Sequence, residues 1–199
     1  MLGGTVRGKT TRLRLPTLDD LPQVDRWAAD MRVRRGGPMG RIGEPCASST
    51  WKERFNDVVK DKDCVLWLIE ADSAAVGLAK IRFSGAPAAD AVDIQQFLID
   101  PGHWHKGHGF DAALTLHRWI FDIVHLRCVN IELPVDQLSA LRIAEKLGYE
   151  RFAHGHEAFY RDSAYVDQYR MRMTLRTWDE RWGAEHREYP APLGPELEA

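Results

Sequence analysis

A chain of 199 residues, of which 44% are hydrophobic, is long enough to bury a sizeable core and is most simply one globular domain. Its 27 Lys and Arg residues are balanced by 29 Asp and Glu residues, and the net charge of −2 argues against a dedicated nucleic-acid binder. The three cysteines are scattered and no apolar run approaches about 18 residues, so we expect a cytoplasmic protein without a signal peptide or a membrane span.

In the first half of the chain, the pattern predicts strands on either side of a helical region. Residues 10–16 alternate apolar and basic side chains up to Pro16, as in a strand with one buried face. Thr17 and the acids after it can cap a helix, whereas residues 32–45 are dense in Gly, Pro and Arg and are expected to form a loop. A second helix is expected over 51–59, and further strands over 64–70, 75–83 and 92–100.

In the second half, helical and strand patterns alternate. A helix over 110–124 places its apolar residues on one face, and a strand over 128–135 follows. Residues 136–149 predict another helix, with Asp136 as its N-cap and Gly148 at its left-handed end. A closing hairpin is expected over 151–160 and 165–175.

These elements predict a mixed α/β (α+β) domain with a mostly antiparallel twisted sheet and flanking helices. The strand at 92–100, the helix at 110–124 and the strand at 128–135 should form a central right-handed βαβ crossover. We expect one domain over residues 1–182. The tail over 183–199 contains three prolines and few apolar residues, as in a mobile arm or an extended surface segment.

Residues 101–113, PGHWHKGHGFDAA, interleave histidines with glycines between a strand and a helix. His103, His105 and His108 could supply three imidazoles to a catalytic zinc ion. However, they lie in a glycine loop rather than at a fixed strand or helix spacing, and no acid or cysteine at ligand spacing joins them. We therefore expect loop histidines without a metal.

The glycines favour a phosphate-binding loop instead. The first N–H groups of a helix lack partners and its dipole favours an anion. Gly107 and Gly109 leave room for an oxygen atom to reach these amides, and Lys106 can add positive charge. The loop lacks the GK[ST] ending of a P-loop. The loop also matches a dinucleotide-binding fingerprint. In this chain the match comes after several strands, whereas in a doubly wound fold the fingerprint normally comes directly after the first strand, so we do not expect that fold here.

The run WHKGHGF (104–110) resembles the pyrophosphate loop of the GNAT superfamily of acyl-CoA-dependent N-acyltransferases, in which Arg/Gln-x-x-Gly-x-Gly/Ala precedes a helix; Trp104 replaces the Arg or Gln. Asp136-x-x-Ser139 and RIAEKLGY (142–149) are similar to the Asn-x-x-Ser…Glu-Lys-x-Gly-Phe segment of the same superfamily. Residues 12–22 and 165–175 resemble the branch that contains ribosomal-protein N-terminal alanine and serine acetyltransferases.

This resemblance implies acetyl-CoA as the co-substrate and no metal. The strand before the loop would diverge from the strand after the helix, and the pantetheine arm would lie in the gap between them. The implied cofactor-binding residues are Phe97, Leu98 and Ile99 along the pantetheine, His105, Lys106, Gly107, His108, Gly109 and Phe110 around the pyrophosphate, and Asp136 and Ser139 at the thiol end.

Direct attack of an amine on a thioester needs a base, donors for the developing oxyanion and an acid for the leaving thiolate. Many relatives place a Tyr acid at the position of Ala144, so Ser139 is the candidate acid here, with a hydrogen bond at the helix end as the alternative. Backbone N–H groups near Leu98 would bind the oxyanion. Asp93 is the first candidate base and Glu132 the second, although a solvated strand-edge charge also explains Asp93.

The predicted function is transfer of an acetyl group from acetyl-CoA to a primary amine, either a protein N-terminus or a small molecule. The alternatives are a non-catalytic CoA-binding module, an enzyme that uses another acyl-CoA such as succinyl-CoA, and a zinc hydrolase. His154 and His156 are expected beside the acceptor pocket, as surface residues. No nucleic-acid or membrane partner is expected, and the chain could form a homodimer.

Overall fold

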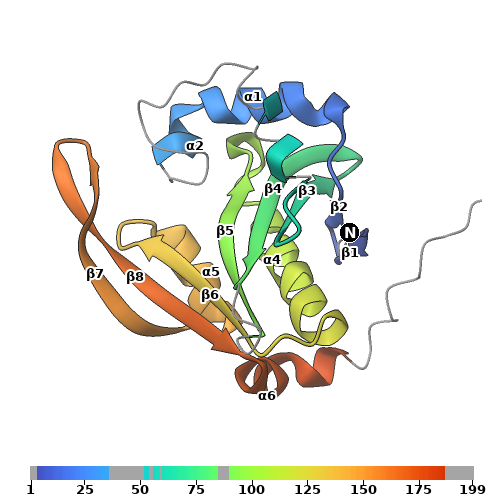
Figure 1. Ribbon diagram of the computed structural model, residues 1–199, viewed down its shortest axis with the longest axis vertical. Coiled ribbons are helices and arrows are strands. Elements are labelled where there is room, and N and C mark those ends of the chain that lie inside the picture. Colours follow the sequence, from blue (N-terminus) through green and yellow to red (C-terminus); the bar gives the residue numbers. More distant parts are fainter. Residues whose placement is uncertain (1–3, 36–51, 54–55, 59, 85–89, 187–199) are drawn as a thin grey trace, which may run out of the picture.

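A single sheet of eight strands organises the molecule (Figure 1). The computed structural model describes residues 4–35, 52–53, 56–58, 60–84 and 90–186. The strand order is β1-β2-β3-β4-β5-β6-β8-β7, and each neighbouring pair is antiparallel except β5 with β6. The structure therefore confirms the mixed, mostly antiparallel sheet with one central crossover.

The elements before the crossover follow the expected order, with a short strand and the short helix α2 added; the helix expected over 51–59 lies partly outside the described residues. Their bounds are β1 Val6–Arg7, β2 Arg12–Arg14, a 3-10 turn Leu18–Asp20, α1 Leu21–Ala29, α2 Met31–Arg35, β3 Cys64–Ala71, β4 Ala74–Phe83 and β5 Ala91–Ile99.

The elements of the crossover and the C-terminal part also follow the expected order, with a helix added at the end. Their bounds are a 3-10 turn Pro101–His103, α4 His108–Arg118, a π-helical turn Trp119–Ile123, β6 Cys128–Pro134, α5 Leu138–Leu147, β7 Glu150–Arg161, β8 Ala164–Thr174 and α6 Leu175–His186.

Both faces of the sheet are covered, and the alternation of β3 shows how. Val65, Trp67 and Ile69 belong to the larger core, which packs against α4, α5 and α6. Leu68 belongs to a smaller core that Trp27 and neighbouring residues of α1 and α2 complete. Because successive side chains of a strand point to opposite faces, one strand serves both cores. The sheet thus has an α1 face and an α4 face.

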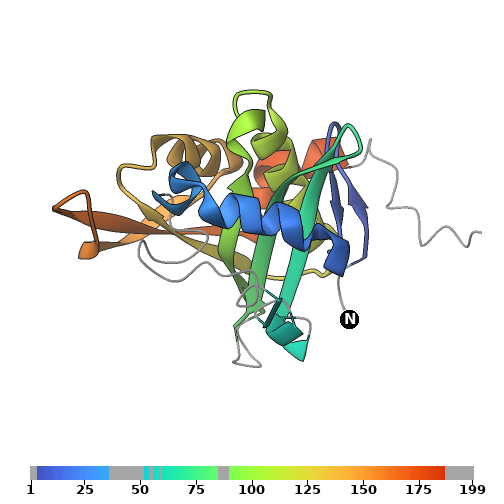
Figure 2. The ribbon, with the colours of Figure 1, turned by 90° about the horizontal axis from the view of Figure 1, so that it is seen from above.

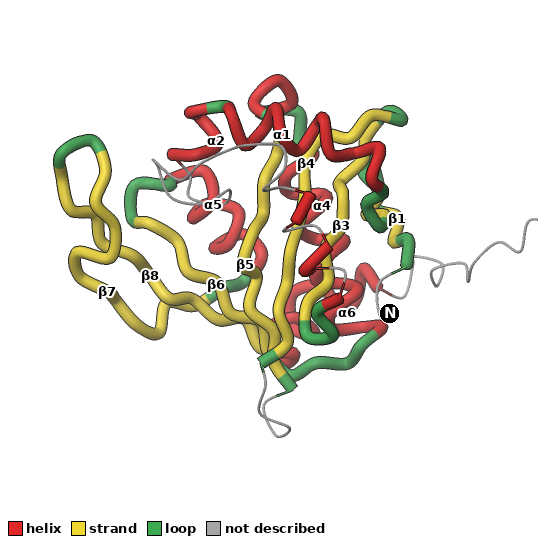
Figure 3. The backbone as a smooth tube through the Cα atoms, turned by 45° about the horizontal axis from the view of Figure 1, so that its top comes forward, coloured by secondary structure: helices red, strands yellow, loops and turns green. Residues whose placement is uncertain are grey.

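The crossover opens a gap in the middle of the sheet. β5 and β6 pair in parallel only over Ala91–Asp93 and Cys128–Asn130, and then they diverge (Figure 3). On its other side β5 stays paired with β4, with one irregularity that leaves Gln95 without a register partner. Among the described residues, the part of β5 beyond Asp93 therefore has no strand along its β6 side.

Two expectations about regular structure are wrong. The first residues of the expected loop at 32–45 form α2, because Val33 is buried in the smaller core and anchors an arginine-rich helical turn. Residues 36–45 lie outside the described residues. The predicted boundary at residue 182 falls inside α6, which continues to His186. Helix α6 is held by packing that the polar sequence conceals: Trp178 is fully buried, and Trp182 donates to the carbonyl of Leu147 over 2.9 Å.

The predicted cap of α5 also needs correction. The helix begins at Leu138 with Gln137 at the N-cap position, so the Asp136 side chain is not its cap. Gly148 does end the helix in the left-handed region, with φ +115°.

The long β7–β8 hairpin extends away from the rest of the molecule (Figure 2). In the described part of the chain, no helix combines the length and apolar character needed to cross a bilayer.

Candidate functional site

The glycine-histidine loop is a tightly bonded connection between β5 and α4. The Asp100 carboxylate accepts from the Gly102 amide at 2.8 Å and from the Trp27 indole at 2.8 Å. The Trp104 indole donates back to the carbonyl of Ile99 over 2.7 Å. Gly107 then enters α4 in the left-handed region with φ +85°, a conformation that glycine adopts without strain.

The start of α4 offers unpaired donors. No backbone hydrogen bond is recorded for the amides of His105 to Phe110 within the described part of the chain, whereas the next amide, of Asp111, bonds to the carbonyl of Gly107. The space around a Cβ on Gly107 is open to 4 Å. Lys146 of α5 lies over the Phe110 ring, with its Nζ 3.8 Å from the ring centre. Free amides, a helix N-terminus and a nearby cation suit an anionic group.

His108 adds a buried polar atom to this loop. The residue is only 8% exposed, and its Nδ1 has no hydrogen-bond partner among the described residues. Its ring lies 6.3 Å from that of His103, whose Nδ1 is likewise buried without a partner. A buried polar atom without a partner is costly, so it favours the approach of a ligand that can pair with it.

Asp111 is a structural residue that sequence reasoning missed. Its carboxylate accepts from the amides of Lys9, Thr10 and Thr11 at 2.8–3.0 Å and from the hydroxyls of both threonines. Burial raises its pKa, but these hydrogen bonds outweigh that effect and hold the pKa below its usual value. The first turn of α4 is thereby fixed to the turn between β1 and β2.

The three residues implied for the pantetheine line up along the free part of β5. Leu98 is buried on the α1 face, and Phe97 and Ile99 pack against the larger core on the α4 face. Their side chains are therefore occupied by packing, and what β5 presents to the gap is its backbone. The structure places this backbone edge next to the glycine loop.

A cavity of about 420 Å³ lies on the α1 face, beside this same stretch of β5. Its sheet wall includes Leu78, Lys80 and Arg82 of β4 and Gln96 of β5. Lys80 and Gln96 are paired directly next to the irregularity at Gln95. The cavity therefore reaches β5 at the level where β5 has separated from β6.

Carboxylates also line the cavity. Asp20, Asp57 and Asp61 contribute to it, and Asp61 forms an ion pair with Arg82. Asp57 has no recorded ion pair or hydrogen bond to its carboxylate among the described residues. One wall thus carries a carboxylate that can accept from a cationic or amine ligand.

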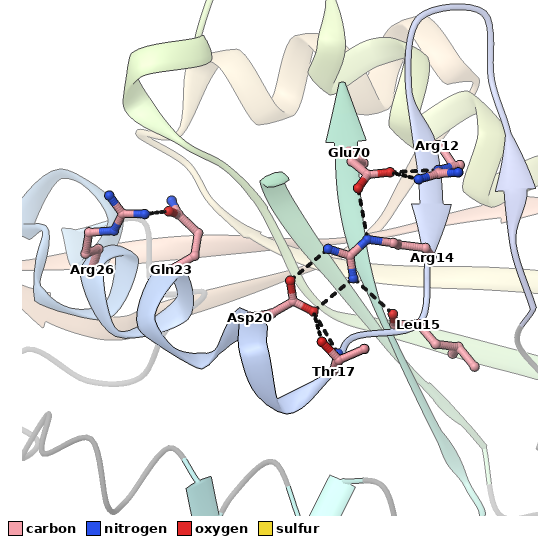
Figure 4. Close-up of polar contacts among 8 residues, drawn as sticks. All are labelled: Arg12, Arg14, Leu15, Thr17, Asp20, Gln23, Arg26 and Glu70. Carbon is pink, nitrogen blue, oxygen red and sulfur yellow. Dashed lines mark hydrogen bonds and ion pairs between the residues drawn. The ribbon is translucent and has the colours of Figure 1, made fainter. Parts of the chain in front are cut away.

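An arginine network fixes the end of α1 that forms this wall (Figure 4). Arg14 of β2 donates to both carboxylate oxygens of Asp20, at 2.7 and 2.9 Å, and to Glu70 of β3 at 3.0 Å. Asp20 also accepts from the amide and hydroxyl of Thr17, which begins the helical turn. The Arg14 guanidinium is the main reason that the pKa of Asp20 is lowered. Asp20 therefore stays ionised at the cavity wall.

Asp93, the first candidate base, lies on the α1 face. It pairs with Arg82, a cavity residue, and cross-strand partners point to the same face. Its carboxylate accepts from the Asn130 amide at 2.9 Å, and Asn130 in turn accepts from Arg172 at 2.8 Å. Asp93 itself does not line the cavity. Glu132, the second candidate, forms an ion pair with Arg170 over 2.6 Å.

Ser139 and Asp136 lie at the start of α5, and both are exposed. Ser139 has no recorded side-chain hydrogen bond in the part of the chain described, so helix-end bonding does not occupy its hydroxyl. Ala144 is buried, so this face of α5 is part of the core. No recorded contact joins Ser139 to Asp93.

The arginines of the region expected to form a loop at 32–45 do not line the cavity in the described part of the chain. Arg32 pairs with Asp30, and Arg35 pairs with Asp162 in the β7–β8 turn; Arg41 lies outside the described residues. His154 and His156, which are expected beside the acceptor pocket, do not line the cavity described above. His154 pairs with Tyr169, which packs against the larger core, so it lies on the α4 face.

Sequence reasoning also missed a buried histidine, His117 of α4. Its ring lies against those of Phe121 and Trp178, with centres 6.3 and 6.2 Å away, and its Nδ1 lies 2.6 Å from the carbonyl of Ala113. A carbonyl can only accept, so Nδ1 carries the proton and Nε2 accepts from the Tyr149 hydroxyl at 2.6 Å. Burial lowers the pKa of His117 to about 4. Helical spacing placed His117 in α4, but its contacts depend on distant segments.

Comparison with known proteins adds family information to this geometry. The family model described as "Acetyltransferase (GNAT) domain" matches residues 11–150. No curated protein matches the chain. The solved structure of a spermidine N-acetyltransferase from Vibrio cholerae, in complex with CoA and spermine, is similar with a TM-score of 0.76 and 18% identity, covering 85% of this chain and 98% of that one.

A second solved structure, an acetyltransferase of the GNAT family from Bacillus anthracis, has a TM-score of 0.71 and 16% identity. The match covers 86% of this chain and 99% of that chain. At these identities the structural likeness concerns the fold, and it agrees with the family model. The comparisons contain no support for the narrower ribosomal-protein branch.

Proposed function

This chain belongs to the GNAT acetyltransferase family, and from that premise we propose that it transfers an acetyl group from acetyl-CoA to a small primary amine. The observation that carries the proposal is the meeting of three features at β5. The gap beside its free edge, the glycine loop at its end and the cavity on its α1 face all adjoin the stretch from Gln95 to Ile99.

The residues at the gap and the loop fit CoA. The unpaired amides from His105 to Phe110 would hold the pyrophosphate, with the left-handed Gly107 leaving the approach open. The backbone of Phe97, Leu98 and Ile99 would pair with the amides of the pantetheine arm. Asp136 and Ser139, at the start of α5, would lie toward the thiol end.

The cavity supports an amine as the acceptor. Asp57 can hold a protonated amino group, while Leu78 and neighbouring leucines contact its carbon chain. A volume of about 420 Å³ suits a small molecule. A protein N-terminus is the second candidate, because it presents the same primary amine. The Vibrio cholerae relative was solved with spermine, a polyamine.

We assign the proton transfers to this chain's own side chains. Bound acetyl-CoA supplies an activated thioester, so that a C–N bond forms as the C–S bond breaks. Asp93 would take the amine proton through water, since it lies on the cavity face without lining the cavity. Ser139 would donate a hydrogen bond to the leaving sulfur, and the backbone N–H groups near Leu98 would stabilise the developing oxyanion.

The activity test measures thiol release from acetyl-CoA with a panel of amines. We expect turnover with small amines and polyamines, weaker turnover with peptides that begin with Ala or Ser, and little with succinyl-CoA. Turnover confined to the peptides would identify a protein N-terminus as the acceptor. Tight CoA binding without thiol release across the whole panel would contradict the enzyme and favour a CoA-binding module.

The role of Ser139 has its own test. In Ser139→Ala we expect kcat to fall about 100-fold, because the leaving sulfur loses its donor. The dissociation constant for CoA should remain within about twofold, since backbone groups provide most of the cofactor contacts. Ser139→Thr keeps a hydroxyl and should restore part of kcat. An unchanged kcat in Ser139→Ala would remove Ser139 from the mechanism.

A further inference from the structure

The β7–β8 hairpin carries two histidines and a carboxylate that meet at one oxygen atom. Oδ2 of Asp167 lies 2.9 Å from Nε2 of His154 and 3.2 Å from Nδ1 of His156. The three ligand atoms all lie within 4.8 Å of one another, and the two imidazole rings are 4.5 Å apart between centres. None of these residues takes part in the proposed transfer reaction.

The backbone builds this cluster. His154 and His156 are two residues apart on β7, so they point to the same side of the strand. The β7–β8 register shifts between Gly155 and Phe159, and Glu157 in this irregular stretch has φ +52°. The Glu157 amide donates to Oδ1 of Asp167 over 2.8 Å. That bond orients the carboxylate and leaves Oδ2 facing both imidazoles.

The geometry points to a metal site: we propose that His154, His156 and Asp167 bind one divalent transition-metal ion, with Zn²⁺ as the reference case. Tetrahedral ligands about 2.0–2.1 Å from zinc lie about 3.3 Å from one another. The distances from Oδ2 to the two imidazole nitrogens, 2.9 and 3.2 Å, are already close to that spacing. Two imidazoles with one carboxylate form a donor set that zinc accepts, with water completing the shell.

Neighbouring groups also hold Asp167 and His154 in place, as metal ligands in proteins usually are. The backbone amide on Oδ1 holds the carboxylate, and the Tyr169 ring lies 5.2 Å from the His154 ring. The carbonyl of Asp167 accepts from the amide of Val135 at 3.0 Å, in the turn between β6 and α5. A bound ion would therefore connect β7 to β8 at a point that also holds the turn leading to Asp136. This site is independent of the proposed function.

The test is a titration of the tag-free chain with Zn²⁺, and with Co²⁺ for its visible absorption. We expect one ion per chain and Co²⁺ bands of a low-coordinate site with nitrogen and oxygen ligands. His156→Ala should weaken binding at least about tenfold. The His156 side chain is 78% exposed, so this variant should fold normally. His125→Asn, which removes another exposed histidine, should bind like the unmodified chain.

A second measurement uses stability instead of binding. Saturating Zn²⁺ should raise the Tm of the unmodified chain, since an ion that binds only the folded state stabilises it. The rise should be absent in His154→Ala and in Asp167→Asn. If Zn²⁺ does not bind with a one-to-one saturation, or if His156→Ala binds it as tightly as the unmodified chain, the cluster is only a pair of histidines sharing a carboxylate.

Discussion

Gly107→Glu is expected to abolish detectable CoA binding. Gly107 lies at the entrance of α4 among unpaired amides, and the space that a side chain would enter there is open. A glutamate would therefore place a negative charge where the pyrophosphate is expected. Two unit charges 4 Å apart near a protein surface repel by about 4 kcal/mol, which corresponds to roughly a thousandfold in affinity.

The matched control is Gly107→Gln, which has the same shape without the charge. Both variants force a non-glycine residue to φ +85°, and so both carry the same backbone strain of about 1–2 kcal/mol. Calorimetry with CoA should show Gly107→Glu binding about 1,000-fold more weakly than Gly107→Gln, as the charge repulsion alone requires. Equal affinities would mean that the pyrophosphate does not lie at this loop.

The second large effect concerns the pH dependence of stability. The pKa of His117 is about 4 in the folded chain because of burial, against about 6.5 for a free imidazole. Above pH 6.5 the histidine is neutral in both states. As the pH falls from about 6.5 to about 4, His117 is protonated in the unfolded chain but stays neutral in the folded chain. The free energy of unfolding therefore decreases by up to about 3 kcal/mol.

We expect His117→Gln to flatten this part of the stability curve. The measurement is the free energy of unfolding by urea at pH 7 and at pH 4.5. Glutamine cannot be protonated, so the difference between the two pH values should shrink by about 2–3 kcal/mol, even if the variant is less stable at both. His125→Asn should keep the full difference. An unchanged difference in His117→Gln would show that other groups dominate the acid limb.

Local patterns in the sequence predicted the strands and the loop well, because each depends on neighbouring residues. The side chains of β3 alternate between the two cores, one on each face of the sheet. Gly107 and Gly148 lie at helix ends where the backbone turns into the left-handed region, a conformation that depends on neighbouring residues only. Helix α6 was missed because its polar residues outnumber its buried ones. Its stability comes from Trp178 and Trp182, whose partners lie in other elements.

The site shows the same division. The run around Gly107 predicted the glycine loop before α4, since a loop with a left-handed glycine at a helix start is a local structure. The contact of Asp93 with Asn130 depends on the parallel pairing of β5 and β6, and the cavity depends on how α1 docks. Neither the Asp93–Asn130 contact nor the cavity can be predicted from the spacing of residues in the sequence. The cluster of Asp167 with His154 and His156 likewise depends on the pairing of β7 with β8 and on the register shift between Gly155 and Phe159.

The link between Asp111 and the first residues bears on how the chain folds. This carboxylate closes a loop of 100 residues when it binds Thr11, and contacts so far apart in sequence are slow to form. During synthesis the amides of residues 9–11 leave the ribosome well before Asp111, their acceptor, is made. These amides stay in contact with water until α4 has formed, so the helix that follows the glycine loop is fixed at its first turn only when residues 9–11 pack against it.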